Sequence, residues 1–453
     1  MAYCIWRSYK LKIDPALVFE ALKDRRHCFF LDSSLNSSGS SRYSFLGADP
    51  FAVFKKSGSD PFDKLRAEFE PFRIPRLARH FPFTGGAVGY LSYDLGFSLE
   101  DKLVKKTADD VKIPDCFFAF YNTAVVIDNL KNILHVFSAG IPEKSAHMAR
   151  ALAKENLRKI ERALSGIRPH GHPANKRSKA SGLCSNFNRG SYCAAVKRAK
   201  QYIKDGDIYQ VNLSQRFRAK TDLGAPQIYL SLRKTSPSPF GAYFDAGEFQ
   251  ILSSSPERFL KLDKGLVVTR PMKGTRPRGR NSREDATLKK ELLNSRKDEA
   301  ELTMIVDLER NDLGKVCDYD SVKVESLRQI EEYSTVFQTT ATVAGCLHKD
   351  KDRFDLLRAC FPGGSITGCP KIRSMEIIEE LEPSRRGIYT GSLGYLSFSG
   401  GMDFNILIRT ILKKGRDLYF GAGAGIVADS APEAEYDETM VKAKGIMEAI
   451  RAG

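Results

Sequence analysis

The residues best placed to do chemistry include two carboxylates in a helical stretch of the C-terminal half. Asp298 and Glu301 lie three residues apart within residues 295–314, so a helix would carry both carboxylates on one face. Glu301 is followed four residues later by Ile305, which places it near the buried side of that helix. A carboxylate at a buried edge needs a cation or a metal as its partner. The stretch therefore predicts a helix that ends at Gly314 and presents an acidic site.

A second acidic stretch, residues 429–444, places Glu435, Glu438 and Lys442 in one helical stripe. On its own, this stripe is typical of an ordinary salt-bridged surface helix. It follows a strand-like run, residues 418–427, that is rich in glycine, and such a loop brings backbone N–H groups close to an anion. Because Mg²⁺ prefers a few carboxylates together with substrate oxygens, the two acidic stretches and the loop predict a magnesium site for a small acidic metabolite.

A lysine and a glycine-rich turn complete the candidate residues. Residues 267–279 are typical of a strand that leads into a turn rich in Pro, Gly and Arg, with Lys273 inside the turn. Such a lysine is either solvated or held near an anion-binding site, where cationic neighbours favour the neutral amine and let it attack a substrate. The spacing leaves both interpretations open. Residues 361–373 form a glycine and hydroxyl turn that could bind a carboxylate, but they lack the ending of a nucleotide P-loop, so ATP use is not indicated.

The elements that must position these residues fall into two halves. Residues 1–165 end in a long helical pattern over 146–164. Residues 166–182 are rich in Gly, Pro, Ser and charge, which is typical of an exposed linker. Residues 183–453 then carry all the candidate segments and are expected to form the catalytic domain, with the first half contributing to a shared core.

A short internal echo supports that shared core. Residues 85–93 and 390–398 match at five positions without gaps, and both are typical of strands entered through glycines. Strands and helices are mixed along the chain, and turn signals join many of the strands. We therefore predict an α+β fold with large, largely antiparallel sheets.

The composition is that of a globular protein, with 42% hydrophobic and 28% charged residues among 453. No apolar run is long enough to span a bilayer and the first residues lack the apolar core of a signal peptide, so we expect a cytoplasmic protein without a membrane partner. The nine cysteines show no Cys-x-x-Cys pair or zinc spacing, which argues against a disulfide framework or a zinc site. The net charge of +16 is spread along the chain, which favours a solvated basic surface over nucleic-acid binding.

Taken together, these segments resemble those of the chorismate-utilising enzymes over nearly all of residues 186–450. The first half resembles the amino-terminal region of that family more faintly, chiefly through residues 85–93. The resemblance implies a large two-lobed, β-sandwich-like antiparallel core with helices on the outside. Within the family, residues 207–217 (DIYQVNLSQRF) and 271–275 (PMKGT) are most similar to the aminodeoxychorismate synthase branch, which makes 4-amino-4-deoxychorismate for p-aminobenzoate and folate.

Two positions separate the branches of the family. Members that add water to chorismate place a lysine base where this chain has Gln210, and glutamine cannot act as that base. Anthranilate synthases typically have alanine where this chain has Lys273. The resemblance implies that Lys273 attacks C2 of the substrate ring and forms a covalent intermediate, which ammonia resolves by attack at C4.

The resemblance also implies roles for further residues. Glu257 is similar to the general acid that protonates the leaving hydroxyl, and Glu301 and Glu438 are similar to the magnesium ligands. Asp298 and Glu435 are then expected to support those ligands or to reach the metal through water. Magnesium is expected to grip the ring carboxylate and to stabilise charge as the hydroxyl leaves. The positions similar to substrate-binding residues are Gln210, Thr275, Ser365, Tyr389, Arg409, Gly423, Gly425 and Lys442.

The resemblance has one departure and leaves alternatives open. Relatives usually have a histidine where this chain has Gln338, and glutamine can hydrogen-bond but cannot carry a proton. The chain has no glutaminase-like cysteine motif, so we expect ammonia from a separate glutamine amidotransferase subunit or from free ammonium. Some relatives hold tryptophan where this chain has residues 31–34, and the local match does not predict binding. The alternative functions are anthranilate synthase component I and a non-catalytic regulatory subunit.

Overall fold

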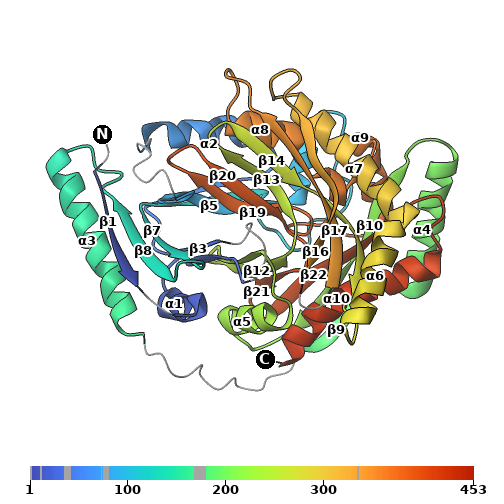
Figure 1. Cartoon of the computed structure of the whole chain (residues 1–453), viewed down its shortest axis with the longest axis horizontal. Helices are drawn as coiled ribbons and strands as arrows, with labels where there is room; N and C mark the ends of the chain where they lie inside the picture. The colour runs from blue at the N-terminus through green and yellow to red at the C-terminus, as the bar shows by residue number, and fades with distance from the viewer. Residues whose placement is uncertain are drawn as a thin grey trace.

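Two large antiparallel sheets pack against each other, and helices cover their outer sides (Figure 1). This is the α+β, sandwich-like architecture that the sequence predicts. The computed structural model describes residues 3–10, 13–34, 42–72, 74, 81–167, 180–333 and 336–452. The predicted linker, residues 166–182, therefore falls largely outside the described residues, at 168–179.

The first sheet combines twelve strands from both halves of the described chain. Strand β2 from the first half pairs with β11 from the second half, so the sheet runs without a break from one half into the other. In spatial order its strands are β1 (Cys4–Lys10), β8 (Ile133–Ala139), β7 (Thr123–Asp128), β3 (Tyr43–Gly47), β2 (Phe29–Asp32), β11 (Phe240–Asp245), β12 (Phe249–Ser255), β21 (Thr410–Lys414), β22 (Asp417–Ile426), β10 (Gln210–Lys220) and β18 (Gly368–Cys369), with β9 (Ser181–Ser185) also paired to β10.

The second sheet combines ten strands in the same way. In spatial order they are β15 (Met272–Pro277), β17 (Val336–Cys346), β14 (Leu266–Arg270), β13 (Arg258–Asp263), β20 (Met402–Ile406), β19 (Ser392–Ser397), β5 (Gly86–Leu91), β6 (Cys116–Tyr121) and β4 (Ala52–Lys56), with β16 (Lys323–Glu332) also paired to β17.

The echoing segments noted in the sequence form neighbouring strands of the second sheet. β5 and β19 pair antiparallel, with Gly89 directly opposite Gly394. A Cβ atom on Gly89 would overlap the carbonyl oxygen of Phe117, and one on Gly394 would overlap that of Asp403. These two glycines therefore allow close approach of the neighbouring backbones, β6 beside Gly89 and β20 beside Gly394, on either side of the junction between the two halves.

The core follows the alternation of side chains along buried strands. On β6, Phe118 and Phe120 face one apolar cluster, while Phe117 and Tyr121 face another. The second of these clusters also contains residues of the first sheet, such as Phe244, so it lies between the two sheets. A strand buried on both faces reads as a continuous apolar run, which explains the uninterrupted burial of β6.

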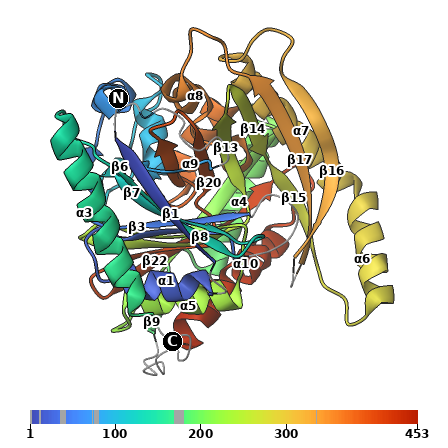
Figure 2. The ribbon, with the colours of Figure 1, turned by 60° about the vertical axis from the view of Figure 1, so that its left-hand side comes forward.

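Helices α4, α5 and α10 cover the first sheet near β10, β12 and β22, and α3 packs on β1 and β8. Helix α7 lies along β15, β16 and β17, with α6 beside it at the periphery (Figure 2). None of the described helices is long and apolar enough to cross a membrane. The helices are α1 (Pro15–Leu22), α2 (Phe62–Phe69), α3 (Ala146–Ser165), α4 (Arg189–Lys204), α5 (Ala225–Thr235), α6 (Ser282–Asn294), α7 (Arg296–Gly314), α8 (Arg353–Cys360), α9 (Lys371–Leu381) and α10 (Pro432–Ala452), with single turns η1 (Glu70–Phe72), η2 (Tyr93–Ser98) and η3 (Gly364–Ile366).

The prediction that Lys273 lies in a turn is wrong, because residues 272–277 form strand β15. Within the described residues β15 pairs only with β17, so it lies at the edge of the sheet. An edge strand tolerates prolines such as Pro277, since one side of it needs no N–H donor. Gly274 has a φ of 76° at a register shift between its two neighbours, which is a bulge that only glycine adopts readily.

Candidate functional site

Lys273 projects from β15 of the second sheet toward Gly425 on β22 of the first sheet, where other candidate residues converge. Its side chain is 15% exposed, and its Nζ lies 3.8 Å from Oε2 of Glu301 on α7. The hydroxyl of Thr339 donates a hydrogen bond to the backbone carbonyl of Lys273, which fixes the bulged strand β15 to β17. The lysine is therefore held in the site, in contrast to a solvated loop lysine.

Gln210 and Gly425 meet Lys273 from the first sheet. A Cβ atom on Gly425 would overlap the amide nitrogen of Gln210 and would lie 3.3 Å from Nζ of Lys273. Gln210 is 1% exposed, and no described residue hydrogen-bonds to its buried Oε1. A hydrogen-bond donor from a water or a ligand would satisfy this oxygen.

Glu257 supplies a buried carboxyl group at the crossing from β12 to β13. Ser365 Oγ donates a hydrogen bond to its Oε1 at 2.6 Å. Burial raises the pKa of Glu257 to about 7, against the lowering effects of the Ser365 hydrogen bond and of Lys273 and Lys442. A carboxyl group that keeps its proton near neutral pH can act as a general acid.

The acidic helices α7 and α10 meet through a lysine that the sequence interpretation did not single out. Nζ of Lys297 lies 3.9 Å from Oε1 of Glu301 and 3.9 Å from Oε1 of Glu435, so these two carboxylates converge on one cation. Burial raises the pKa of Glu435, and the nearby Glu438 adds to this effect. The donor chemistry is that of a hard-cation site.

Glu438 lies at the exposed rim of the same cluster. Its Oε1 is 2.7 Å from Nζ of Lys442, which in turn donates a hydrogen bond to the carbonyl oxygen of Gly423 at 2.9 Å. Although burial opposes it, the positive charges of Lys442, Lys273 and Lys297 lower the pKa of Glu438. Within the described residues, no group of three or more His, Cys, Asp or Glu side chains has metal-binding geometry.

Asp298 takes a different partner from Glu301, although the two share a helix. Nη2 of Arg276 donates a hydrogen bond to Oδ2 of Asp298 at 3.1 Å. Asp298 also packs below the bulge, where a Cβ on Gly274 would lie 2.9 Å from its Cγ. The structure therefore places Asp298 beneath β15 and Glu301 in the site.

Arg409 and Tyr389 are residues for which the family resemblance implies contacts to substrate carboxylates, and that role stays a prediction. Among the described residues, none hydrogen-bonds or ion-pairs with the guanidinium of Arg409, whose pKa burial lowers. Its backbone has a φ of 50°, a conformation that is uncommon for a residue with a side chain and is often found at functional sites. The Tyr389 hydroxyl lies 3.1 Å from the point where a Cβ on Gly423 would sit. A half-buried guanidinium that has no acidic partner within the described residues is suited to an anionic ligand.

Thr275 and Gln338 form a pair on the neighbouring strands β15 and β17. Nε2 of Gln338 donates a hydrogen bond to Oγ1 of Thr275 at 3.2 Å, and the buried Oε1 of Gln338 has no partner in the part of the chain that the structure describes. Thr275 itself is exposed. Glutamine therefore makes hydrogen bonds at this position, but it cannot act as an acid or a base.

Glu309 is a buried carboxyl group that the sequence interpretation missed. It lies on α7, and Oγ1 of Thr269 donates a hydrogen bond to its Oε2 at 2.8 Å. Burial raises its pKa well above the usual value, and the nearby Glu257 adds to the rise. Its spacing from Ile305 and Leu313, four residues on either side, marks a carboxylate inside an apolar stripe.

Residues 31–34, where some relatives hold tryptophan, lie apart from Lys273 at a cavity of about 300 Å³. The cavity opens between the ends of strands from both sheets, and Leu31, Asp32 and Ser33 line it. Arg233 forms an ion pair with Asp32, with Nε 2.6 Å from Oδ2.

Comparisons with known proteins agree with this architecture. Residues 27–448 match the model of a family described as chorismate binding enzyme. Over 460 residues the chain is 38% identical to anthranilate synthase component 1 of Acetivibrio thermocellus, which covers 96% of this chain and 92% of that protein. Over 452 residues it is 38% identical to aminodeoxychorismate synthase component 1 of Bacillus subtilis (strain 168), which covers 95% and 93%. The crystal structure of anthranilate synthase component I from Streptococcus pneumoniae TIGR4 has a TM-score of 0.81 and 32% identity, covering 91% of this chain and 94% of that one.

Proposed function

The chain belongs to the chorismate-binding enzyme family, and we propose that it aminates chorismate with ammonia to give 4-amino-4-deoxychorismate. The observation that carries this proposal is the primary amine of Lys273, enclosed beside Gln210 and Gly425 and 3.8 Å from Glu301. An enclosed amine can serve as a nucleophile in its neutral form. Gln210 supplies no base for activating water, which favours an amine product over a hydroxylated one.

The reaction then has two displacements that share one acid. The neutral amine of Lys273 forms a bond to C2 of the ring, the two ring double bonds shift, and the C4 hydroxyl leaves as water with the proton of Glu257. Ammonia next attacks C4, the double bonds shift back, and the lysine amine leaves C2. Glu257, now a carboxylate, accepts a proton from the attached nitrogen and is restored. Its pKa of about 7 suits both proton transfers at neutral pH.

The remaining residues bind and orient the substrate. Arg409 supplies a guanidinium that has no acidic partner among the described residues, and Tyr389 and Gly423 supply a hydroxyl and a closely approachable backbone. These groups suit the two carboxylates of chorismate. Ser365 keeps Glu257 oriented through its 2.6 Å hydrogen bond.

We propose magnesium as the cofactor of this site. Glu301 and Glu435 already converge on the single ammonium of Lys297, and Glu438 lies beside them. We propose that Glu301 and Glu438 hold the ion, with Glu435 supporting it. When bound, Mg²⁺ would supply electrostatic clamping of the ring carboxylate.

The direct test is to identify the product. Purified protein with chorismate, ammonium and Mg²⁺ is expected to form an aminated product that gives p-aminobenzoate only after a separate lyase is added. Lys273→Ala and Glu301→Ala are expected to abolish chorismate consumption. If wild-type protein consumes no chorismate, the protein is a non-catalytic subunit and the proposal is wrong.

Anthranilate synthesis is the second candidate, and the comparisons give it equal support. The relative from A. thermocellus that carries this name is 38% identical to the chain, as is the B. subtilis aminodeoxychorismate synthase. This alternative predicts a fluorescent aromatic product, anthranilate, without any lyase. Lys273 argues for the first candidate, because anthranilate formation as the resemblance describes it needs no lysine there.

A partner subunit is part of the proposal. Both relatives are named component 1, which implies a second component. We propose that a glutamine amidotransferase supplies the ammonia, so that glutamine replaces ammonium only when that subunit is added. Glutamine use by the isolated chain would contradict this.

A further inference from the structure

A buried ion pair lies behind the site and takes no part in the chemistry proposed above. Nη2 of Arg386 is 2.6 Å from Oε1 of Glu382, and Nε donates a second hydrogen bond to Oε2 at 2.9 Å. The two side chains are 2% and 5% exposed. They lie at the end of α9 and in the turn that leads to Tyr389. Such a pair needs further hydrogen bonds to offset the loss of water.

The first set of these hydrogen bonds holds β10, the strand that begins with Gln210. Nη2 of Arg386 donates to the carbonyl oxygen of Asn212 at 2.6 Å. Oε1 of Glu382 accepts from the backbone N–H of Ser214 at 2.8 Å and from its hydroxyl at 2.9 Å. In the sheet, Asn212 and Ser214 pair with Gly425 and Gly423. The ion pair therefore fixes the strand ends that carry Gln210 and the substrate-facing glycines.

The second set holds the turn that contains Ser365. Nη1 of Arg386 donates to the carbonyl oxygen of Ile366 at 2.9 Å, and Nδ2 of Asn212 donates to the same oxygen at 3.2 Å. The backbone N–H of Asn212 also donates to the carbonyl oxygen of Thr367 at 2.8 Å. Ser365 precedes these anchors and hydrogen-bonds Glu257. The orientation of the acid is thus tied to Arg386 through one intervening turn.

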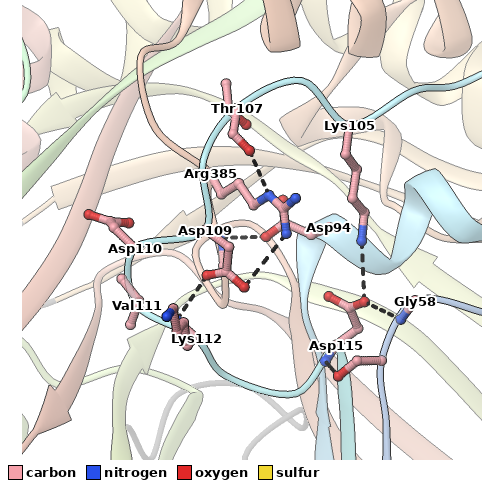
Figure 3. A network of polar contacts seen from close by, with 12 residues as sticks. Gly58, Asp94, Lys105, Thr107, Asp109, Asp110, Val111, Lys112, Asp115 and Arg385 are labelled. Atoms are coloured by element: carbon pink, nitrogen blue, oxygen red, sulfur yellow. Dashed lines mark hydrogen bonds and ion pairs between the residues drawn. The ribbon is translucent and has the colours of Figure 1, made fainter.

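The third contact is with the turn of Tyr389 itself. Nη1 of Arg386 donates to Oγ1 of Thr390 at 3.2 Å, and the guanidinium lies 5.9 Å from the centre of the Tyr389 ring. The outer side of this turn is fixed separately (Figure 3): Nε of Arg385 donates to the carbonyl oxygen of Thr107 at 3.0 Å. Nη1 of Arg385 also lies 3.6 Å from Oδ2 of Asp109, which the same view shows. The turn is therefore anchored on both sides, and only its inner anchor reaches the site.

We propose that Arg386, held by Glu382, is a positioning residue that fixes Gln210, Ser365 and Tyr389 relative to one another for the reaction on chorismate. Within the described residues, all the hydrogen bonds of its guanidinium other than those to Glu382 end on the segments that carry these three residues. The planar guanidinium can donate hydrogen bonds to all these acceptors at the same time, and a lysine ammonium cannot reproduce that geometry. The inference rests on the proposed function only in that chorismate is the substrate.

The test uses Arg386→Lys, which keeps the charge opposite Glu382 but loses the planar guanidinium. Turnover is followed as loss of chorismate and expressed per folded molecule, with folding measured by circular dichroism. We expect kcat/KM to fall about 100-fold, as for other displacements of about 1 Å around a reacting centre. Glu382→Gln, which keeps the shape of the side chain, is expected to show a loss in the same direction.

The matched control is Asp128→Asn in the first half of the chain. Asp128 is a 3% exposed carboxylate that holds Arg42 by hydrogen bonds of 2.6 and 3.1 Å. Its loss is expected to leave turnover per folded molecule unchanged. A purely structural role for Arg386 predicts the same result for Arg386→Lys, and that outcome would overturn the inference.

Two further readouts separate positioning from stability. The Ser365 hydrogen bond lowers the pKa of Glu257, so loosening Ser365 is expected to move the alkaline limb of the pH profile upward in Arg386→Lys, as in Ser365→Ala. The double variant Arg386→Lys/Ser365→Ala is expected to lose little more kcat/KM than the worse of the two single variants, because both substitutions disturb the same placement of Glu257. If the losses of kcat/KM in the two single variants multiply in the double variant, and the pH profile of Arg386→Lys does not move, the inference is contradicted. An inactive wild-type protein would contradict the proposed function instead.

Discussion

Replacement of Glu257 by glutamine is expected to raise stability at alkaline pH while it removes activity. The carboxyl group is 4% exposed, and burial raises its pKa from the usual 4.5 to about 7. Such a group binds its proton more tightly in the folded chain than in the unfolded chain. Its stabilising contribution is fully present below pH 4.5 and is lost as the pH rises through about 7.

The magnitude follows from the same values. At about 1.4 kcal/mol for each pH unit, the rise from 4.5 to about 7 corresponds to about 3 kcal/mol. In Glu257→Gln the amide cannot ionise, yet its oxygen can still accept the hydrogen bond of Ser365. At about pH 8 the variant is therefore expected to be more stable than wild type by up to about 3 kcal/mol. Turnover of chorismate is expected to fall by about 10²–10⁴, since the general acid is lost.

Urea unfolding at about pH 5 and about pH 8, followed by far-UV circular dichroism, measures this difference. The advantage of Glu257→Gln is expected to grow with pH. Glu438→Gln is the control, because the pKa of Glu438 is lowered. That carboxylate contributes stability that is present at high pH and lost as the pH falls, so its removal is expected to give no gain at about pH 8. Equal pH dependence in Glu257→Gln and wild type would refute the reasoning and remove the basis for Glu257 as the acid.

Three other substitutions follow from the site geometry. Gly425→Ala is expected to abolish turnover in a folded protein, because the new Cβ would occupy the space beside Lys273; full activity measured with chorismate would contradict this. Arg409→Gln is expected to raise KM for chorismate about 10- to 100-fold without loss of thermal stability, because the guanidinium has no acidic partner among the described residues; a destabilised protein with unchanged KM would point to a structural role. Lys297→Met is expected to tighten Mg²⁺ binding a few-fold in calorimetry, because its ammonium lies 3.9 Å from Glu301 and is partly screened by solvent; weaker binding would place the ion elsewhere.

Local signals in the sequence were sufficient to predict two long helices, one of which carries site residues. Residues 295–314 become α7, whose first turn is capped by the Ser295 hydroxyl and whose last residue is Gly314. Residues 146–164 become α3, with Ala149, Ala153, Leu157 and Ile160 buried at helical spacing. Such elements depend on caps and on apolar periodicity, which are written in neighbouring residues.

The strand that carries Lys273 could not be predicted in this way. Its prolines and glycine favour a turn by local rules, but β17 pairs with it from more than sixty residues further along the chain. The pairing supplies hydrogen bonds that the local sequence does not reveal, and the bulge at Gly274 absorbs the extra residue. Tertiary pairing therefore outweighed local propensity.

The ion-pair partners of the carboxylates on α7 also could not be predicted from the sequence. Asp298 and Glu301 share a helical face, yet one pairs with Arg276 and the other lies near Lys273 and Lys297. Those choices depend on where β15 and α10 cross α7, which spacing within α7 does not specify. The roles predicted for Glu301, Glu438 and Lys273 came from the resemblance to the chorismate family and stay predictions.

The covalent step at Lys273 tests the central claim most directly. Wild-type protein is incubated with chorismate and Mg²⁺ without ammonia, and the intact mass and its peptides are measured. We predict a mass increase equal to chorismate less one water, located on the peptide that contains Lys273, absent from Lys273→Ala and removed by added ammonium. Formation of anthranilate with ammonium, without any adduct on Lys273 under turnover conditions, would contradict the account.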